Sequence, residues 1–266
     1  MEAGSEDKSF WEHIDDLRSV LFRAVAVLFV LMIVAFFMKG FIFDKVLLAP
    51  LSSDFVLYRG FNWILEKMGA SPMDDFRIEM INIDMAAQFF MHVKISFYVA
   101  LVVSMPLMFY FLWTFVRPAL YENERAAIQK SFGFAGILFY SGVLVGYYLV
   151  FPLTIRFLGT YQVSSSIPNQ ISLTSYFGML IGLVLVMGIV FEMPVLSALL
   201  SRFGIISKQL LQKYRRHAVV VLVVLAAIIT PSGDPVTLIF VSIPLYALYE
   251  LSIMVAKPAK EEDDID

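Results

Sequence analysis

Long hydrophobic runs alternate with short polar stretches along this chain of 266 residues. Five runs reach about the 20 residues that an α-helix needs to cross a bilayer core of ~30 Å. They extend over Val20–Met38, Ala86–Val116, Phe132–Leu158, Leu173–Leu200 and Val236–Val255. A shorter run within His217–Pro231 has about 13 apolar residues, or ~20 Å of helix. It predicts a short fifth helix that crosses a locally thinned bilayer, and a re-entrant or buried segment is the alternative.

The lysines and arginines predict how these helices are oriented. They gather after the second run, after the fourth run and beyond the last one, as Arg117, Arg125, Lys130, Arg202, Lys208, Lys213, Arg215, Arg216, Lys257 and Lys260. The segments 159–172 and 230–234 contain none. Because positive charge marks the cytoplasmic side of a membrane protein, both termini and both basic loops are expected in the cytoplasm. Two ends on one side require an even number of crossings, which is six with the short fifth helix.

The longest polar segment, Lys39–Met85, is expected on the outer side. Apolar residues recur within it at spacings of three and four, at Leu57, Phe61, Leu65 and Met68. This stripe predicts an amphipathic helix that ends near Gly69, and Trp63 favours a position at the membrane interface. No internal repeat is visible, so residues 1–256 are expected to form a single six-helix transmembrane domain. The acidic tail at 257–266 is expected to be disordered.

The composition agrees with an all-α integral membrane protein and argues against several other classes. Hydrophobic residues make up 59% of the chain and charged residues 16%, whereas soluble domains carry about 25% charged residues. There is no cysteine, and the histidines at 13, 92 and 217 lack the spacing of metal ligands. Phosphate-binding loops, HExxH pairs and GxSxG elbows are missing too. We therefore expect no catalytic residue, no metal, no cofactor and no nucleic-acid partner.

Four carboxylates near the predicted cytoplasmic surface are candidate ligands for a cationic peptide. They are Asp15, Asp16, Glu122 and Glu124, and basic residues lie beside them in the sequence. Carboxylates form charge-assisted, bidentate hydrogen bonds with guanidinium groups. The alternative interpretation is ordinary solvated loop charge.

Glu192 is the one carboxylate that the pattern places deep within the membrane. It lies about nine residues before the basic loop at Ser201, or ~13 Å of helix, which is near the middle of a ~30 Å core. Such residues usually have a function or a partner. Pro194 has no N–H for the carbonyl of Val190, which predicts a kink beside the carboxyl group. We expect this notch to receive a polar group from a partner helix or an inserted peptide, and a bond within the bundle is the alternative.

Five stretches, in order along the chain, together resemble the TatC family, the multi-spanning receptor component of the twin-arginine protein translocase. They are HIDDLR (His13–Arg18), FVRPALYENER (Phe115–Arg125), LFYSGVLVGYYLVFPLTIRFL (Leu138–Leu158), FEMPV (Phe191–Val195) and IPLYALYELSI (Ile243–Ile253). The resemblance covers nearly the whole chain. It implies a cupped bundle of six helices with Glu192 on its concave face.

The resemblance also implies a substrate and partners. In this family the cytoplasmic face binds the paired arginines of signal peptides on folded precursors. By position, the arginine-binding carboxylates would be Glu124 and Asp16, in a site shaped by Phe115, Pro118, Tyr121 and Arg125. TatA- and TatB-type single-helix proteins would be partners in the inner membrane of a prokaryote, the chain would self-associate, and the proton-motive force would drive export.

The sequence departs from the family pattern at three places. Asp16 stands where the family has Glu, so either Asp15 or Asp16 is the working residue. No second basic residue follows Arg18. At the start of the sixth helix only Thr237 remains near the position of a partner-docking glutamine.

Two other classes remain open from the residues alone. A proton-coupled secondary transporter would use Glu192 as its proton carrier, although such folds usually contain repeated halves. A structural scaffold for membrane assembly is the second.

Overall fold

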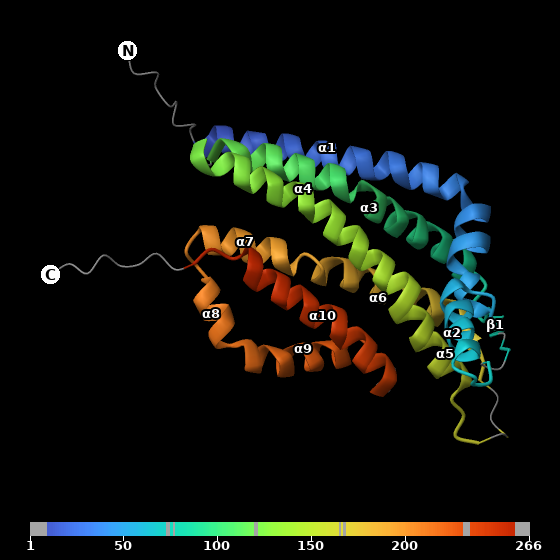
Figure 1. Ribbon diagram of the computed structural model, residues 1–266. Helices are drawn as coiled ribbons and strands as arrows, with labels where there is room; N and C mark the ends of the chain where they lie inside the picture. The colour runs from blue at the N-terminus through green and yellow to red at the C-terminus, as the bar shows by residue number, and fades with distance from the viewer. Residues whose placement is uncertain are drawn as a thin grey trace, which may run out of the picture.

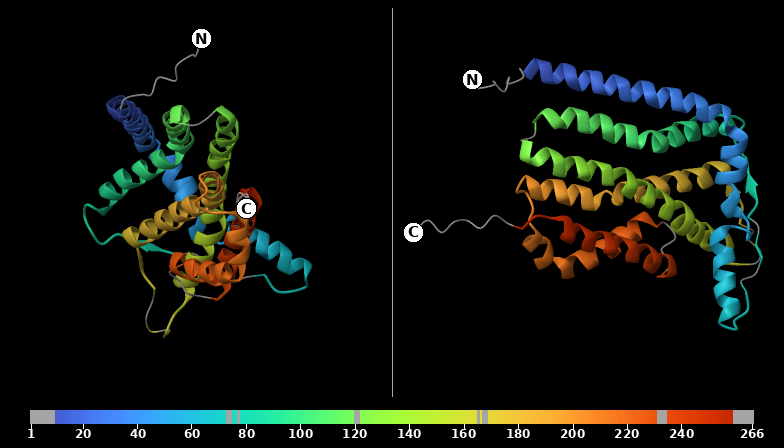
Figure 2. Two further views of the ribbon diagram at one scale, coloured as in Figure 1. Left: turned by 90° about the vertical axis from the view of Figure 1, so that its left-hand side faces the viewer. Right: turned by 45° about the horizontal axis from the view of Figure 1, so that its top comes forward.

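Long helices run back and forth along one axis in the computed structural model (Figures 1 and 2). The structure describes residues 10–72, 75–76, 78–119, 122–164, 166, 169–230 and 235–258. In chain order the first half contains α1 (Phe10–Phe37), the π-helix η1 (Phe41–Leu47), the 3-10 turn η2 (Ala49–Leu51), α2 (Val56–Lys67), β1 (Met80–Ile81), α3 (Ala87–Val116) and the 3-10 turn η3 (Arg117–Ala119). The second half contains α4 (Glu122–Val145), the π-helix η4 (Gly146–Val150), α5 (Phe151–Thr160), β2 (Ile171–Ser172), α6 (Leu173–Val190), α7 (Met193–Arg202), α8 (Lys208–Lys213), α9 (Arg215–Ile229) and α10 (Pro235–Val255).

Within the described part of the chain, five helical segments are long and apolar enough to cross a membrane. They are Ile14–Phe37, Ala87–Val116, Phe132–Thr160, Leu173–Arg202 and Thr237–Val255, which confirms the five long runs. The short run forms α9, whose 15 residues extend about 22 Å. α9 runs away from the end that carries the termini, and α10 runs back toward it (Figure 1). The crossing of α9, and with it the count of six, stays a prediction.

Two of the long segments are interrupted where proline enters the chain. The third passes from α4 through the π-helical turn η4 into α5, with Pro152 at the start of α5. The fourth breaks between Val190 and Met193, and Pro194 occupies the first turn of α7. The missing N–H of Pro194 leaves the carbonyl of Val190 without its usual helical donor. The predicted kink beside Glu192 is therefore confirmed as a break between α6 and α7.

Glycines allow α4 and the following turn η4 to approach α6 closely. A Cβ atom at Gly142 would lie 2.5 Å from the carbonyl oxygen of Met187, and one at Gly146 would lie 3.0 Å from the Cα of Val184. A Cβ atom on the facing residue Gly188 would lie 2.8 Å from the ring of Phe139. This packing of small residues every four positions is how membrane helices gain close contact without a hydrophobic driving force.

Tyrosine hydroxyl groups tie the segment after α1 to the rest of the bundle. Tyr147 and Tyr176 donate to the carbonyl oxygens of Val46 and Leu47, at the end of η1. The last carbonyls of a helix have no partner within it, so these bonds satisfy groups that would otherwise be orphaned. A two-residue parallel pairing of β1 with β2 lies at the same end of the bundle (Figure 1).

The amphipathic helix predicted in the long polar segment is α2. It projects from the end opposite the two chain termini, across the direction of the long helices (Figure 2). Tyr58 is buried and donates to the carbonyl oxygen of Pro152 at 2.7 Å, whereas Trp63 is 58% exposed beneath the amine of Lys67. Gly69, with φ of +74°, ends the helix in the left-handed region.

Both ends of the described chain lie at the other end of the bundle (Figure 1). There the backbone N–H of Lys208 donates to the carbonyl oxygen of Lys257, whose own N–H donates to Ser201 Oγ. These bonds join the ends of α7 and α10 to the start of α8. The acidic tail lies outside the described residues from 259 onward.

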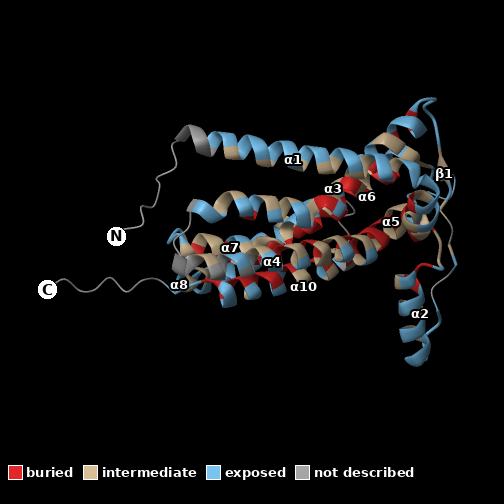
Figure 3. Cartoon of the chain, turned by 90° about the horizontal axis from the view of Figure 1, so that it is seen from above, coloured by how far each residue is buried: buried red, intermediate tan, exposed pale blue. Residues whose placement is uncertain are grey.

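Buried residues are concentrated on α6, which contacts α3, α4 and α5, and α1 is exposed along most of its length (Figure 3). An apolar surface of this extent suits a chain that is surrounded by lipid.

Candidate functional site

The start of α1, the end of α3 and the start of α4 lie at the end of the bundle that carries the termini, with α1 next to α3 (Figures 1 and 2). Asp15 and Asp16 lie in the first two turns of α1, which packs along α3. Consecutive helical residues point about 100° apart, and the structure shows the difference, since Asp15 is exposed and Asp16 is half-buried.

The turn between α3 and α4 holds the other residues of this candidate site. Phe115 is half-buried at the end of α3, and Pro118 is exposed in η3. Glu124 and Arg125 lie in the first turn of α4, and Arg125 is half-buried. Negative side chains at a helix N-terminus are favoured by the helix dipole. The structure thus brings this part of the predicted site to one end of the bundle, while the side chain of Glu124 and the whole of Tyr121 lie outside what it describes.

Glu192 occupies the N-cap position of α7, at the break after α6. Its side chain is half-buried, and its Oε1 atom is buried without a hydrogen-bond partner among the described residues. An unsatisfied polar atom in an apolar environment is destabilising. The surroundings are packed closely, because a Cβ atom on Gly142 would lie 2.8 Å from the Cβ of Phe191, the residue before Glu192. This carboxyl group therefore has an unused acceptor deep in the fold.

Thr237 lies in the first turn of α10, and its side chain is 1% exposed. The structure therefore places it inside the bundle.

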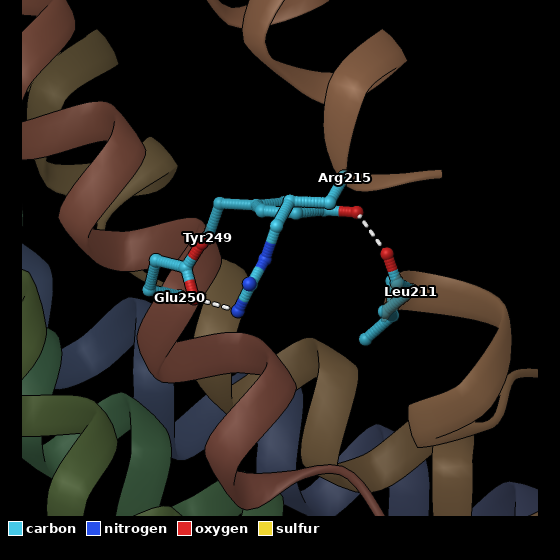
Figure 4. Close-up of polar contacts among 4 residues, drawn as sticks. All are labelled: Leu211, Arg215, Tyr249 and Glu250. Atoms are coloured by element: carbon cyan, nitrogen blue, oxygen red, sulfur yellow. Dashed lines mark hydrogen bonds and ion pairs between the residues drawn. The ribbon is translucent and has the colours of Figure 1, made fainter. Parts of the chain in front are cut away.

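A second carboxylate inside an apolar helix was not predicted from the sequence. Glu250 of α10 accepts a hydrogen bond from Arg215 at the start of α9, and its Oε1 is buried without a hydrogen-bond partner among the described residues (Figure 4). The adjacent Tyr249 donates its hydroxyl group to the carbonyl oxygen of Leu211 at 2.7 Å. The signal was a charged residue inside the last apolar run, a feature that usually marks a paired or functional group.

Among the residues that the structure describes, no group of three or more His, Asp or Glu side chains could hold a metal ion. The candidate sites contain carboxylates and carbonyl oxygens, which bind cationic groups and hydrogen-bond donors.

The fold and these groups define an all-α, multi-pass membrane protein with carboxylates at one end and within the membrane-spanning part. The sequence model of the family described as Sec-independent protein translocase protein (TatC) matches residues 12–244. The chain belongs to the TatC family, and it is therefore a component of a protein translocase. This assignment favours protein transport over the secondary-transporter alternative.

Curated relatives and solved structures agree with this assignment. The Sec-independent protein translocase protein TatC of Blattabacterium sp. subsp. Periplaneta americana is 34% identical over 260 residues, which cover 96% of this chain and 97% of the relative. TatC of Helicobacter pylori strain J99 is 42% identical over 177 residues, covering 65% and 70%. A crystal structure described as the twin arginine translocase receptor TatC aligns with a TM-score of 0.66 at 29% identity, covering 91% of this chain and 97% of that one.

Proposed function

We propose that this chain is the receptor subunit of a twin-arginine translocase and binds the signal peptides of folded precursors. The observation that carries the proposal is that the start of α1, the end of α3 and the start of α4 lie at the end of the bundle where both termini lie (Figure 1). Asp16 and the first turn of α4 come from segments more than a hundred residues apart in sequence. A solved relative is described as the receptor of this translocase, which supports the same role here.

The two arginines of the peptide would each meet one carboxylate. Glu124 and Asp16 supply two oxygens each, and the fork of a guanidinium group forms two parallel hydrogen bonds with such a group. Lysine presents a single ammonium group and cannot form the same pair of bonds. Phe115, Pro118, Tyr121 and Arg125 would shape the surroundings of these carboxylates. Asp15, which is exposed, is the weaker candidate because it points away from Asp16.

The intramembrane groups would serve partner proteins. Glu192 Oε1 has no hydrogen-bond partner among the described residues, so it can accept a hydrogen bond from a polar group of an entering helix. TatA- and TatB-type single-helix proteins are the proposed partners, together with further copies of this chain. Thr237 is a second proposed docking position and would need to become accessible first. Export would be driven by the proton-motive force, across the inner membrane of a prokaryote, with both termini in the cytoplasm.

Photo-crosslinking tests the proposed peptide site directly. A photoreactive residue in place of the exposed Pro118 should crosslink to a twin-arginine precursor, and crosslinking should disappear when the two arginines are changed to lysines. The control is the same group in place of Pro235, which is exposed at the start of α10. Equal crosslinking from both positions, or crosslinking that ignores the arginines, would refute the site.

A further inference from the structure

A cavity of about 470 Å³ opens between η1, the two residues before it, α3 and the start of α6, at the end of the bundle opposite the termini; we call it the polar cavity because four polar side chains line it. Lys39, Asp44, Gln88 and His92 contribute its polar side chains. Lys39 and Asp44 are exposed, and neither forms an ion pair or a hydrogen bond with any residue that the structure describes. His92 Nε2 is 2.9 Å from the carbonyl oxygen of Phe36, in the last turn of α1, and so fixes one wall of the cavity. The cavity lining therefore contains one cationic and one anionic side chain.

A second cavity of about 280 Å³ lies further along the same helices and is lined almost wholly by apolar side chains. On α3 it continues from His92 to Ile95 and Val102, and on α6 it continues from Leu173 to Phe177 and Val184. Residues spaced by three, four or seven positions lie on one face of a helix, so the two cavities lie along the same faces of α3 and α6. The polar hydroxyl group of Tyr147 in its wall is already bonded to the carbonyl oxygen of Val46.

The ring of Phe43 lies between the two cavities. Its centroid is 5.7 Å from the ring of His92 in the polar cavity and 5.4 Å from the ring of Phe177 in the apolar one. The apolar cavity runs along α3 from Ile95 to Val103, which is about 12 Å of helix. One leaflet of a ~30 Å hydrocarbon core is about 15 Å deep. The dimensions fit the headgroup and part of one acyl chain of a lipid in a single leaflet.

We propose that the two cavities together bind one phospholipid with a phosphoethanolamine headgroup, from the leaflet at the end opposite the termini. Lys39 binds the phosphate and Asp44 accepts hydrogen bonds from the ammonium group, while an acyl chain occupies the apolar cavity. Charge-assisted hydrogen bonds of this kind need N–H donors on the headgroup. A choline headgroup has none, and an anionic glycerol headgroup has no cation for Asp44. An apolar cavity does not hold water well, which favours a hydrocarbon chain as its occupant.

Native mass spectrometry of the delipidated protein tests this proposal. Titration with phosphatidylethanolamine should give one retained lipid at concentrations where phosphatidylcholine and phosphatidylglycerol are lost. Lys39→Gln and Asp44→Asn should each weaken retention about three- to tenfold, because the groups are exposed. The matched controls are Lys45→Gln and Asp54→Asn, which change exposed neighbours that line neither cavity.

A bulky substitution tests the apolar part separately. Val102→Trp fills the acyl-chain cavity and should abolish retention of the single lipid, whereas Val220→Trp, on the exposed face of α9, should not. Equal retention of the three lipids, or equal losses in the head-group variants and their controls, would show ordinary boundary lipid and overturn the proposal. The headgroup variants decide the question even if Val102→Trp fails to fold, because they alter only exposed side chains.

Discussion

Replacing Gly142 with alanine should force α4 away from α6. An added Cβ would lie 2.5 Å from the carbonyl oxygen of Met187, whereas ordinary van der Waals contact begins at 3.4 Å. The shortfall is 3.4 − 2.5 = 0.9 Å. A backbone carbonyl inside a helix cannot rotate out of the way as a side chain can. One of the two helices therefore has to move, and with it the break that carries Glu192.

The size of the effect follows from two opposing contributions. Overpacking of a tight interface is destabilising by ~1–3 kcal/mol, and alanine in place of glycine inside a helix stabilises by ~1 kcal/mol. Gly136 lies on the same helix, and a Cβ there would meet nothing within 4 Å. Gly136→Ala therefore shows the helical gain alone. We expect Gly142→Ala to be less stable than Gly136→Ala by ~1–3 kcal/mol.

The assay is thermal unfolding of the two purified variants and the original protein in one detergent. Gly136→Ala should unfold at or slightly above the original temperature, and Gly142→Ala clearly below it. If both variants unfold at the same temperature, α4 and α6 are not in the contact described here.

Three further predictions follow from the carboxylates. Glu192→Gln should keep much of the export of a twin-arginine reporter, because the amide still accepts a hydrogen bond. Glu192→Ala should lose export but keep precursor binding, and full export by this variant would count against a transport role. Arg215→Gln should lower thermal stability by ~1–3 kcal/mol by leaving Glu250 without its cation, and adding Glu250→Gln should recover most of the loss; no recovery would mean that the two groups are not coupled. Asp16→Asn should weaken precursor binding more than Asp15→Asn in a pull-down assay, and equal losses would indicate general charge attraction.

The long helices could be predicted from sequence because a run of about 20 apolar residues has few alternatives in a bilayer. The kink at Pro194 was predicted from the sequence, but proline alone does not decide where a helix is interrupted. Pro106 and Pro244 lie inside α3 and α10, whereas Pro152 and Pro194 stand where new helices begin. The difference arises from the neighbouring helices, which either satisfy the freed backbone groups or do not.

Contacts between segments far apart in the chain could not be predicted from the sequence pattern either. The bond from Tyr176 to Leu47 joins residues 129 positions apart, and that from Tyr147 to Val46 joins residues 101 apart. The pairing of Arg215 with Glu250 depends on the turn between α8 and α9, which brings a residue from a basic loop beside an apolar helix.

The candidate site was predictable to different degrees. The sequence left Asp15 and Asp16 as alternatives, and the structure distinguishes them because Asp15 is exposed and Asp16 is half-buried. The burial of Thr237 was not predictable, because a threonine near the start of a membrane helix suits an exposed and a buried position equally well.

Binding of a labelled twin-arginine signal peptide to the purified protein in nanodiscs directly tests the proposal that this chain is a signal-peptide receptor. Binding should saturate, and it should be lost with a twin-lysine peptide. Glu124→Ala should weaken binding about ten- to hundredfold, as expected from the loss of a charge-assisted hydrogen bond of ~1.5–3 kcal/mol. Equal binding of both peptides, or unchanged affinity in a folded Glu124→Ala protein, would contradict it.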